Sequence, residues 1–240
     1  RKLVHNYNTG IDGKIINFTE TSAGGGYIRE GDSMGDVYIT KVLKRDATGA
    51  IAVAADGSLS SMDLPNGERL RIGNTNPDFT LGWRNNISWK GLNLSFLINA
   101  RVGGIVTSET QAVLDQFGVS KATADARDRG YVEVAGGQRV DPQKYYEVVA
   151  NQQLLGYYYY SATNVRLQNV SLTYTLPKTL LGQGWPGITV GFIANNLWMI
   201  YNKAPFDPEI AASTGTYGQG SDYFSAPSLR NIGFSLKLNF

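Results

Sequence analysis

The sequence predicts an all-β fold, made of antiparallel strands of a transmembrane β-barrel with long extracellular loops. Three observations lead to this prediction. Polar and apolar residues alternate over long stretches, which is typical of strands with two different faces. Several of these stretches reach the roughly 9–11 residues that a strand needs to cross a bilayer. Short turns and long connections also alternate along the chain, as they do in outer-membrane barrels.

The composition argues against several other classes of protein. Of the 240 residues, 42% are hydrophobic and 18% are charged, and the charged share is below the roughly 25% of an ordinary soluble protein. The net charge of +2 gives no reason to expect a nucleic acid partner. The chain has no cysteine, which excludes a disulfide framework and a thiolate metal site. No stretch approaches the roughly 20 apolar residues of a membrane helix.

The clearest predicted element is a hairpin of two strands, over residues 79–89 and 92–104. Apolar residues occupy odd positions before Lys90-Gly91 and even positions after it. A two-residue turn requires this change of parity, because directly paired residues share a face of the sheet. The register therefore pairs the following residues: Trp89 with Leu92, Ile87 with Leu94, Trp83 with Ile98, and Leu81 with Ala100.

Three further strands are predicted after the hairpin, over residues 165–176, 188–201 and 229–240. In the first of these, the alternation changes phase near Gln168, which predicts either a β-bulge or the start of the strand near that position. Pro177 ends the same strand, because proline cannot donate a hydrogen bond to a neighbouring strand. Together with the hairpin, these segments make five clear strands.

The connections between the strands predict the organisation of the chain. Residues 105–162 and 202–228 are the long ones, and the segments 107–117 and 141–155 within the first can form short helices. We expect residues 1–75 to be an extracellular loop region with short strands, the best of them at 36–43. We expect residues 76–240 to hold the barrel strands and their loops.

The two faces of the predicted strands differ in chemistry. We expect the apolar face to contact lipid and the small, polar face to line the barrel lumen. The alternative is a soluble β-sandwich, whose strands also alternate, but sandwich strands are usually only about 5–6 residues long. The predicted lumen-facing residues are Arg84, Asn86, Asn93, Ser95, Asn99, Arg101, Asn169, Ser171 and Thr173.

Motifs that would suggest catalysis or metal binding are weak in this sequence. The string GDSMG around Ser33 resembles the nucleophile loop of a serine protease, but the only histidine is His5 and nothing places it near Ser33. Asp46, Asp56 and Asp63 lack the spacing of an EF-hand and are better explained as turn residues. We therefore predict that the chain is not an enzyme and holds no metal or cofactor.

Tyrosines are the best candidates for substrate contact. Four consecutive tyrosines enter a strand from the predicted outer side, and they could stack on a sugar or a peptide. The alternative, which we favour, is an aromatic girdle combined with packing inside the loops. The last external loop carries the same ambiguity. The candidate residues are Tyr157, Tyr158, Tyr159, Tyr160, Tyr217 and Tyr223.

The chain closes on the alternating segment NIGFSLKLNF, residues 231–240. Its apolar residues predict a lipid-facing row, and an aromatic ring at the end suits the membrane interface. In outer-membrane proteins generally, such a last strand resembles the signal that the assembly machinery reads. The residues assigned to this signal are Phe234, Leu236, Leu238 and Phe240.

Four stretches, in order, resemble the SusC/RagA family of TonB-dependent outer-membrane transporters. They are IGNTNPDFTLGWRNNISWKGLNLSFLINARVGG (72–104), YYYYSATNVRLQNVSLTYTLPK (157–178), ITVGFIANNLWMIYNKAPFDPE (188–209) and SLRNIGFSLKLNF (228–240). The resemblance implies the C-terminal strands of a large barrel, of about 22 strands, that encloses a plug. Because no plug sequence is visible, the chain is similar to one piece of a longer transporter.

The family resemblance also implies a function and a set of partners. It implies import of glycans or peptides across the outer membrane of a Gram-negative cell, driven by TonB through the plug. The expected partners are the remaining N-terminal part of the transporter, a SusD-like surface lipoprotein and outer-membrane lipid. The alternative is a structural or adhesive barrel without energised transport.

Overall fold

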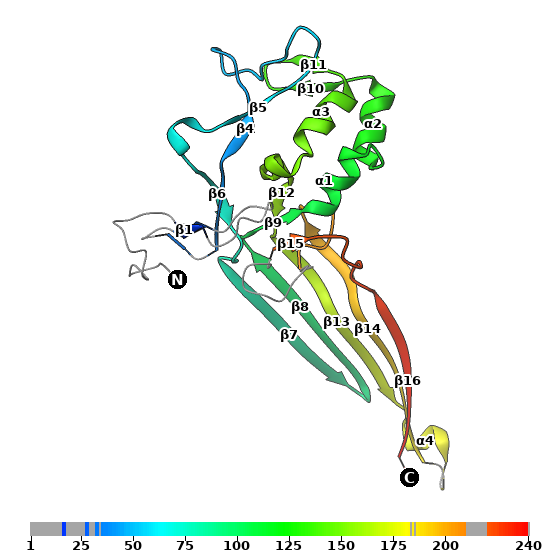
Figure 1. Cartoon of the computed structure of the whole chain (residues 1–240). Coiled ribbons are helices and arrows are strands. Elements are labelled where there is room, and N and C mark those ends of the chain that lie inside the picture. Colours follow the sequence, from blue (N-terminus) through cyan, green and yellow to red (C-terminus); the bar gives the residue numbers. More distant parts are fainter. Residues whose placement is uncertain are drawn as a thin grey trace. The chain divides into compact units, whose positions relative to one another are not determined.

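The computed structural model describes residues 16–17, 27–28, 32–33, 35–182, 184, 186–209 and 220–239. The chain divides into two compact units (Figure 1). The sheet unit comprises residues 77–103, 161–210 and 226–240, and the loop unit comprises residues 1–76, 104–160 and 211–225. The antiparallel sheet of the first unit confirms the all-β prediction.

The sheet unit is built on five long antiparallel strands. They are β7 (Phe79–Trp89), β8 (Leu92–Val102), β13 (Asn164–Thr175), β14 (Gly187–Asn202) and β16 (Asn231–Asn239). Their order in the sheet is β16-β14-β13-β8-β7, so each strand lies next to its predecessor among the five. A short helix, α4 (Lys178–Leu181), lies in the connection between β13 and β14. All five predicted strands are confirmed. Their observed ends differ from the predicted ones by two residues or fewer.

The turn between β7 and β8 has the predicted two-residue geometry. Lys90 and Gly91 have φ angles of 44° and 84°, as in the tight hairpin turns whose twist matches that of the strands. The observed register contains all four predicted pairs, from Trp89 with Leu92 to Leu81 with Ala100. A Cβ atom at position 91 would lie 2.8 Å from the carbonyl oxygen of Thr175. This close approach explains why glycine occupies the turn.

The predicted bulge is present at Gln168. Leu167 pairs with Ile98 and Asn169 pairs with the next residue back, Leu97, so Gln168 has no partner on β8. The extra residue restores the phase of the strand. Residues before and after the bulge therefore present their apolar side chains on the same face of the sheet.

The loop unit contains short strands in small sheets. β3 (Asp36–Ile39) pairs with β6 (Leu70–Asn74), and β4 (Lys41–Leu43) pairs with β5 (Ser61–Asp63). A third sheet has the order β12-β9-β15. The remaining bounds are β1 (Ile16–Asn17), β2 (Tyr27–Ile28), η1 (Pro65–Gly67), β9 (Ile105–Ser108), β10 (Val132–Val134), β11 (Gln138–Val140), η2 (Gln152–Tyr158), β12 (Tyr159–Ser161) and β15 (Ser221–Asp222).

Three capped helices belong to the loop unit: α1 (Glu109–Gln116), α2 (Lys121–Arg129) and α3 (Pro142–Val149). The side chains of Ser108, Ser120 and Asp141 each accept a backbone hydrogen bond at the start of one helix, which satisfies a donor that the helix leaves free. The sequence predicted α1 and α3 but not α2. No helix in the described part of the chain is long and apolar enough to cross a membrane.

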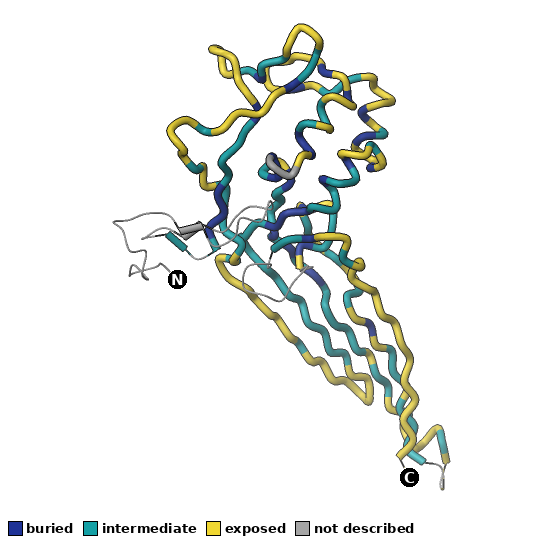
Figure 2. Tube along the Cα trace, in the orientation of Figure 1, coloured by how far each residue is buried: buried dark blue, intermediate teal, exposed yellow. Residues whose placement is uncertain are grey.

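The loop unit has its own hydrophobic core, and Figure 2 marks buried positions along its helices and strands. Buried side chains from α1, α3 and η2 pack together with those of β4, β10 and β11. The core residues are Leu43, Ile51, Leu59, Ala112, Val134, Val140, Val149, Ala150, Leu154, Leu155 and Tyr158. The long connection is therefore a folded structure rather than an extended loop.

Candidate functional site

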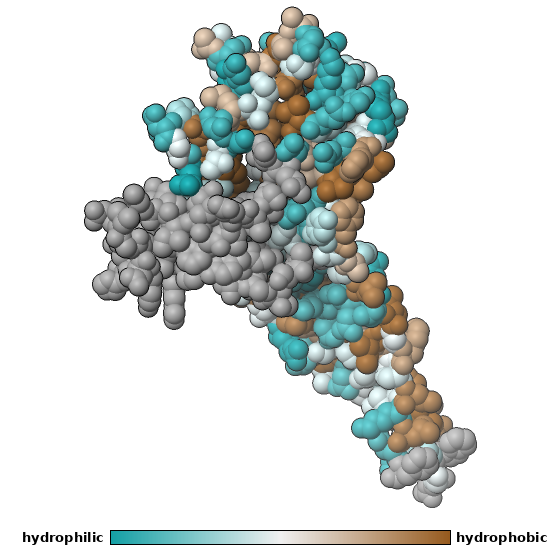
Figure 3. Space-filling model, in the orientation of Figure 1, coloured by the Kyte–Doolittle hydropathy of each residue, from teal (hydrophilic) through white to brown (hydrophobic). Residues whose placement is uncertain are grey.

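The apolar face of the sheet consists of side-chain rows that cross all five strands. Two successive rows are Ile87, Leu94, Leu172, Phe192 and Phe234, followed by Trp89, Leu92, Tyr174, Val190 and Leu236. Hydrophobic side chains are visible along one side of the strands (Figure 3). The exposed fractions reach 86% for Phe234 and 65% for Trp89. Such a continuous exposed apolar surface is rare on soluble monomers and suits contact with lipid.

The opposite face of the same strands is small and polar. Asn86, Ser95 and Ser171 form one row, and Asn93 and Thr173 belong to the next. The register places all nine residues predicted to face the lumen on this one face, although Leu97 and Ile193 interrupt the polar rows. The structure thus brings the predicted set together, and the assignment of this face to a lumen stays a prediction.

A buried ion pair joins the segment after β14 to β13. The guanidinium of Arg166 donates to both carboxylate oxygens of Asp207, at 2.7 and 3.2 Å. Its Nε atom donates to Asn164 at 3.2 Å, and Glu209 lies 3.4 Å away. The side chains of Arg166 and Asp207 are only 7% and 8% exposed. A two-point contact of this kind fixes both position and orientation, so it anchors residues 203–209 to the sheet.

The electrostatics of this ion pair favour the charged form of Asp207. Burial alone would raise the pKa of the Asp207 carboxyl, but hydrogen bonds from Arg166, Ser228 and the backbone of Glu209 outweigh it and hold the pKa below its ordinary value. The pair could not be predicted from the sequence, because its members are 41 residues apart.

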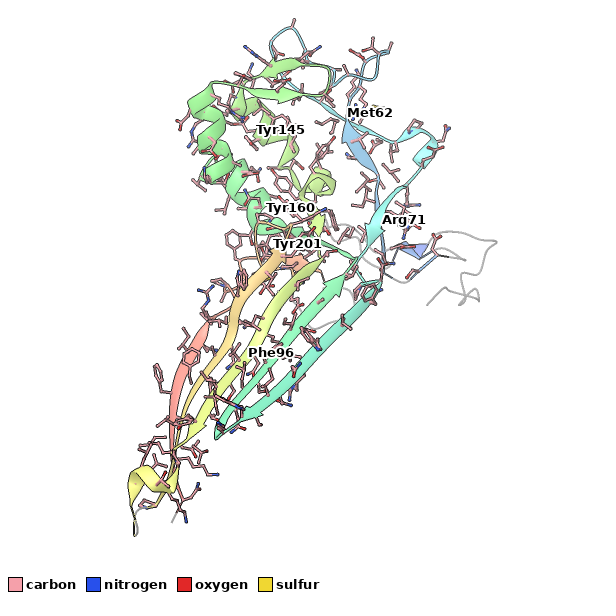
Figure 4. All side chains as sticks on the ribbon, turned by 180° about the vertical axis from the view of Figure 1, so that it is seen from behind. Met62, Arg71, Phe96, Tyr145, Tyr160 and Tyr201 are labelled. Atoms are coloured by element: carbon pink, nitrogen blue, oxygen red, sulfur yellow. The ribbon has the colours of Figure 1, made fainter. Side chains whose placement is uncertain are left out.

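The candidate tyrosines do not form a single surface. Tyr157 is 41% exposed, Tyr159 and Tyr160 are partly buried, and Tyr158 is 4% exposed in the core of the loop unit. Tyr160 packs against the same core, as does Tyr145, and both are labelled in Figure 4. The ring of Tyr158 is therefore taken up by packing and is not presented to a ligand.

The connection between β14 and β16 offers a more exposed aromatic pair. Tyr223 is 56% exposed, and its ring contacts that of Phe224 with centroids 5.2 Å apart. Tyr217 lies outside the described residues. Substrate contact by Tyr157 and Tyr223 stays a prediction.

Tyr158 also has a polar role inside the core. Its hydroxyl donates to Oδ2 of Asp115 at 3.0 Å, and both side chains are buried. Burial and the nearby Asp115 charge raise the pKa of the Tyr158 hydroxyl well above its ordinary value, so it stays protonated and donates.

The Tyr158→Phe variant is expected to loosen the loop unit. The carboxylate of Asp115 would lose a buried donor, and a hydrogen bond to a charged group contributes about 1.5–3 kcal/mol. Amide hydrogen exchange in α1 and η2 should become faster in the full-length protein. The control is Tyr157→Phe, whose hydroxyl accepts only a long 3.4 Å bond from Leu43; equal exchange in both variants would contradict the assigned role.

The predicted assembly signal lies on an edge strand. Phe234, Leu236 and Leu238 are all exposed on β16, on the face formed by the apolar rows. The ring of Phe234 contacts that of Phe192, with centroids 5.7 Å apart. Phe240 lies outside the described residues. A role of this row in assembly stays a prediction.

The serine-containing string GDSMG has a structural explanation. The backbone amide of Ser33 donates to Oδ2 of Asp36 at 3.0 Å, and Oδ1 of Asp36 accepts from Arg71 at 2.7 Å. The string thus leads into an ion pair at the start of β3. His5 lies outside the described residues. Among those that are described, no group of acidic residues and histidines is arranged to hold a metal ion.

Comparison with known proteins identifies related sequences and folds. No protein-family model matches the chain. TonB-dependent receptor P3 of Formosa agariphila is 26% identical over 238 residues, which cover 89% of this chain and 23% of the receptor. TonB-dependent receptor P39 of the same organism is 27% identical over 180 residues, covering 72% of this chain and 17% of the receptor. In sequence and fold, the chain thus resembles TonB-dependent receptors of the SusC/RagA type.

Solved structures share the fold of this chain. The RagAB peptide transporter matches with a TM-score of 0.59 and 20% identity, over 93% of this chain and 24% of the matched one. The RagAB peptide importer in the closed-closed state matches with a TM-score of 0.57 and 19% identity, again over 93% and 24%. The chain thus spans about a quarter of the length of these proteins.

Proposed function

We propose that this chain forms part of the barrel wall of a TonB-dependent importer in the outer membrane of a Gram-negative cell. The observation that carries the proposal is the sheet of five long strands with one exposed apolar face and one polar face. Lipid would cover the apolar face, and the polar face would line the passage or contact the plug. The plug and the remaining strands would come from the N-terminal part of the same transporter.

The proposed substrates are peptides or glycans, captured with the help of a SusD-like lipoprotein. The solved structures with this fold are named as peptide importers, which makes peptides the first class to test. TonB would supply energy through the plug, and the strands described above would do no chemistry. Uptake of labelled peptides and labelled oligosaccharides by cells with and without the full-length gene tests this proposal; no difference for either class would favour a structural or adhesive barrel.

The native protein is expected in the outer membrane. A free sheet with these apolar rows would be insoluble in water, because exposing each ring or aliphatic side chain to water costs free energy. Fractionation should recover the protein from outer membranes only after detergent extraction. Recovery as a monomer from the soluble fraction would rule out a lipid-facing sheet.

The edges of the sheet are expected to be covered by strands of a larger chain. β7 and β16 are the edge strands, and an edge strand in lipid leaves its backbone groups without partners. Purification in detergent should therefore yield the rest of the transporter together with a surface lipoprotein. A homogeneous species of only 26.2 kDa would contradict this expectation.

A further inference from the structure

The loop unit contains a cleft between its three helices that the proposed import function does not explain. Residues from the end of α1, from α2 and from α3 line it, and its volume is about 350 Å³. This volume lies near the lower end of the roughly 300–1,000 Å³ that small-molecule sites occupy. All the lining residues belong to the loop unit, so the cleft is defined within one compact body.

Asp115 supplies a buried negative charge to this cleft. It lines the cleft, yet the residue is only 4% exposed. Its Oδ1 atom accepts from the side-chain amide of Gln111 at 2.7 Å, and its Oδ2 atom accepts from Tyr158 at 3.0 Å. Both donors are neutral, and among the described residues no cation lies within salt-bridge distance of the carboxylate. A carboxylate can accept further hydrogen bonds beyond these two.

A buried carboxylate without a cation is costly, because desolvation is not repaid by an opposite charge. The charge of Asp115 acts on the hydroxyl groups of three nearby tyrosines. Burial raises the pKa values of the Tyr145, Tyr146 and Tyr160 hydroxyls, and the negative charge of Asp115 raises each of them further. Of these three tyrosines, Tyr146 lines the cleft, so the negative charge of Asp115 acts on a group at the cleft itself.

The other charges at the cleft belong to exposed side chains. Arg127 donates to the backbone oxygen of Gly118, and Glu147 accepts from Gln143. Both Arg127 and Glu147 are exposed, so solvent screens their charges much more than that of Asp115. Of the three charged residues that line the cleft, Asp115 is the buried one.

The walls of the cleft include aromatic and apolar surface. Tyr146 lines it from α3, and Phe117 lines it just after α1. Phe117 is 74% exposed, which is unusual for a phenylalanine in the folded part of a loop unit. Aromatic faces attract organic cations, and apolar walls suit a ligand with a hydrocarbon body.

We propose that this cleft binds a small organic cation, an ammonium or guanidinium group carried on an apolar body, with the charge directed toward Asp115. The cation would supply the opposite charge that the buried carboxylate lacks, and the rings of Tyr146 and Phe117 would contact the apolar body. The group could be carried by a free amine or by a basic side chain of a peptide. This site goes beyond the proposed import function and does not depend on it.

Binding to the purified full-length protein tests this proposal. The probes are benzylamine and its neutral analogue benzyl alcohol, measured by calorimetry in detergent solution. Benzylamine is expected to bind about tenfold more tightly or better, because a charged hydrogen-bonded pair forms only with the amine. The Asp115→Asn variant should lose this preference, whereas Asp128→Asn, at an exposed position on α2, should keep it.

A second pair of probes separates the two sources of the cation. N-acetyl-lysine methylamide and N-acetyl-norleucine methylamide differ in the charge of one peptide side chain. A preference for the lysine derivative assigns the site to peptide side chains, and a preference confined to benzylamine assigns it to free amines.

Two results would overturn the proposal: equal or absent binding of the charged and neutral probes, or a preference that survives in Asp115→Asn. If the Asp115→Asn protein does not fold, the affinity of the Phe117→Ser variant for benzylamine tests the proposal instead. Removing this exposed ring should weaken the binding of benzylamine several-fold, and unchanged affinity would exclude the cleft as the binding site. None of these measurements requires transport, so failure here and failure of the import proposal are distinguishable.

Discussion

Replacing Phe234 with lysine is expected to deplete the assembled protein from the outer membrane. Phe234 is 86% exposed in the middle of β16 and stands in the apolar row that crosses all five strands. A lysine on the lipid face costs about 2–4 kcal/mol near the midplane of the bilayer. The measurement is the amount of folded full-length protein in purified outer membranes, compared with the wild type.

The control for this variant is Ser235→Lys, one residue further along the same strand. Ser235 pairs with Gly191 on the polar face, which already carries Lys237 two residues later. A lysine at position 235 should therefore be much milder than one at position 234. Equal membrane levels for the wild type and both variants would show that the two faces have been assigned wrongly.

Deletion of Phe240 should also lower the membrane level if the terminal aromatic ring contributes to assembly.

Replacing Arg166 with methionine is expected to release residues 203–209 from the sheet. The carboxylate of Asp207 would stay buried without its cation, and breaking a buried pair in this way costs about 3–5 kcal/mol. Lys203 provides the readout, because trypsin can cleave the Lys203–Ala204 bond. Cleavage there in the full-length protein should become about tenfold faster or more, since proteolysis follows the population of the open segment.

The matched control is Lys121→Met, which removes an exposed ion pair instead of a buried one. The Nζ atom of Lys121 lies 2.6 Å from Oδ2 of Asp125, but the two side chains are 86% and 55% exposed. Exposed pairs of this kind contribute little to stability, so the cleavage rate after Lys203 should not change. An unchanged rate in Arg166→Met as well would show that the buried pair does not anchor this segment.

Acid should release the same segment in the wild-type protein. Because the pKa of Asp207 is lower in the folded state than its ordinary value, its stabilising contribution is complete above that ordinary value. The contribution is lost as the pH falls through the lowered pKa. Amide exchange of residues 203–209 should therefore increase below about pH 4. In Arg166→Met the carboxyl has lost the cation that lowers its pKa, so this acid-dependent increase in exchange should be absent.

The sheet could be predicted from the sequence because its signals are local and long. The hairpin of β7 and β8 follows from alternation on both sides of Lys90-Gly91, and the bulge at Gln168 follows from a change of phase within one strand. Both patterns lie within a few residues of the feature that they predict.

The parts that could not be predicted depend on distant or weak signals. α2 has the sequence KATADARDR, which lacks the apolar periodicity of an amphipathic helix. The pairing of Arg166 with Asp207 and that of Tyr158 with Asp115 join residues about 40 positions apart. The run of four tyrosines does not indicate which of them is buried. That this is Tyr158 depends on where η2 ends and β12 begins.

The pairing of β9 with β12 has a consequence for how the sheet can fold and vary. β9 follows β8 almost directly, β12 comes just before β13, and β9 and β12 are hydrogen-bonded neighbours in one sheet. The long connection between β8 and β13 is thus closed where it begins and ends, so the entropy cost of joining its ends does not have to be met when these two strands pair. A connection closed in this way can gain, lose or exchange residues between β9 and β12 without altering the register of β8 and β13. Related chains are therefore free to diversify this region while the strand order stays the same.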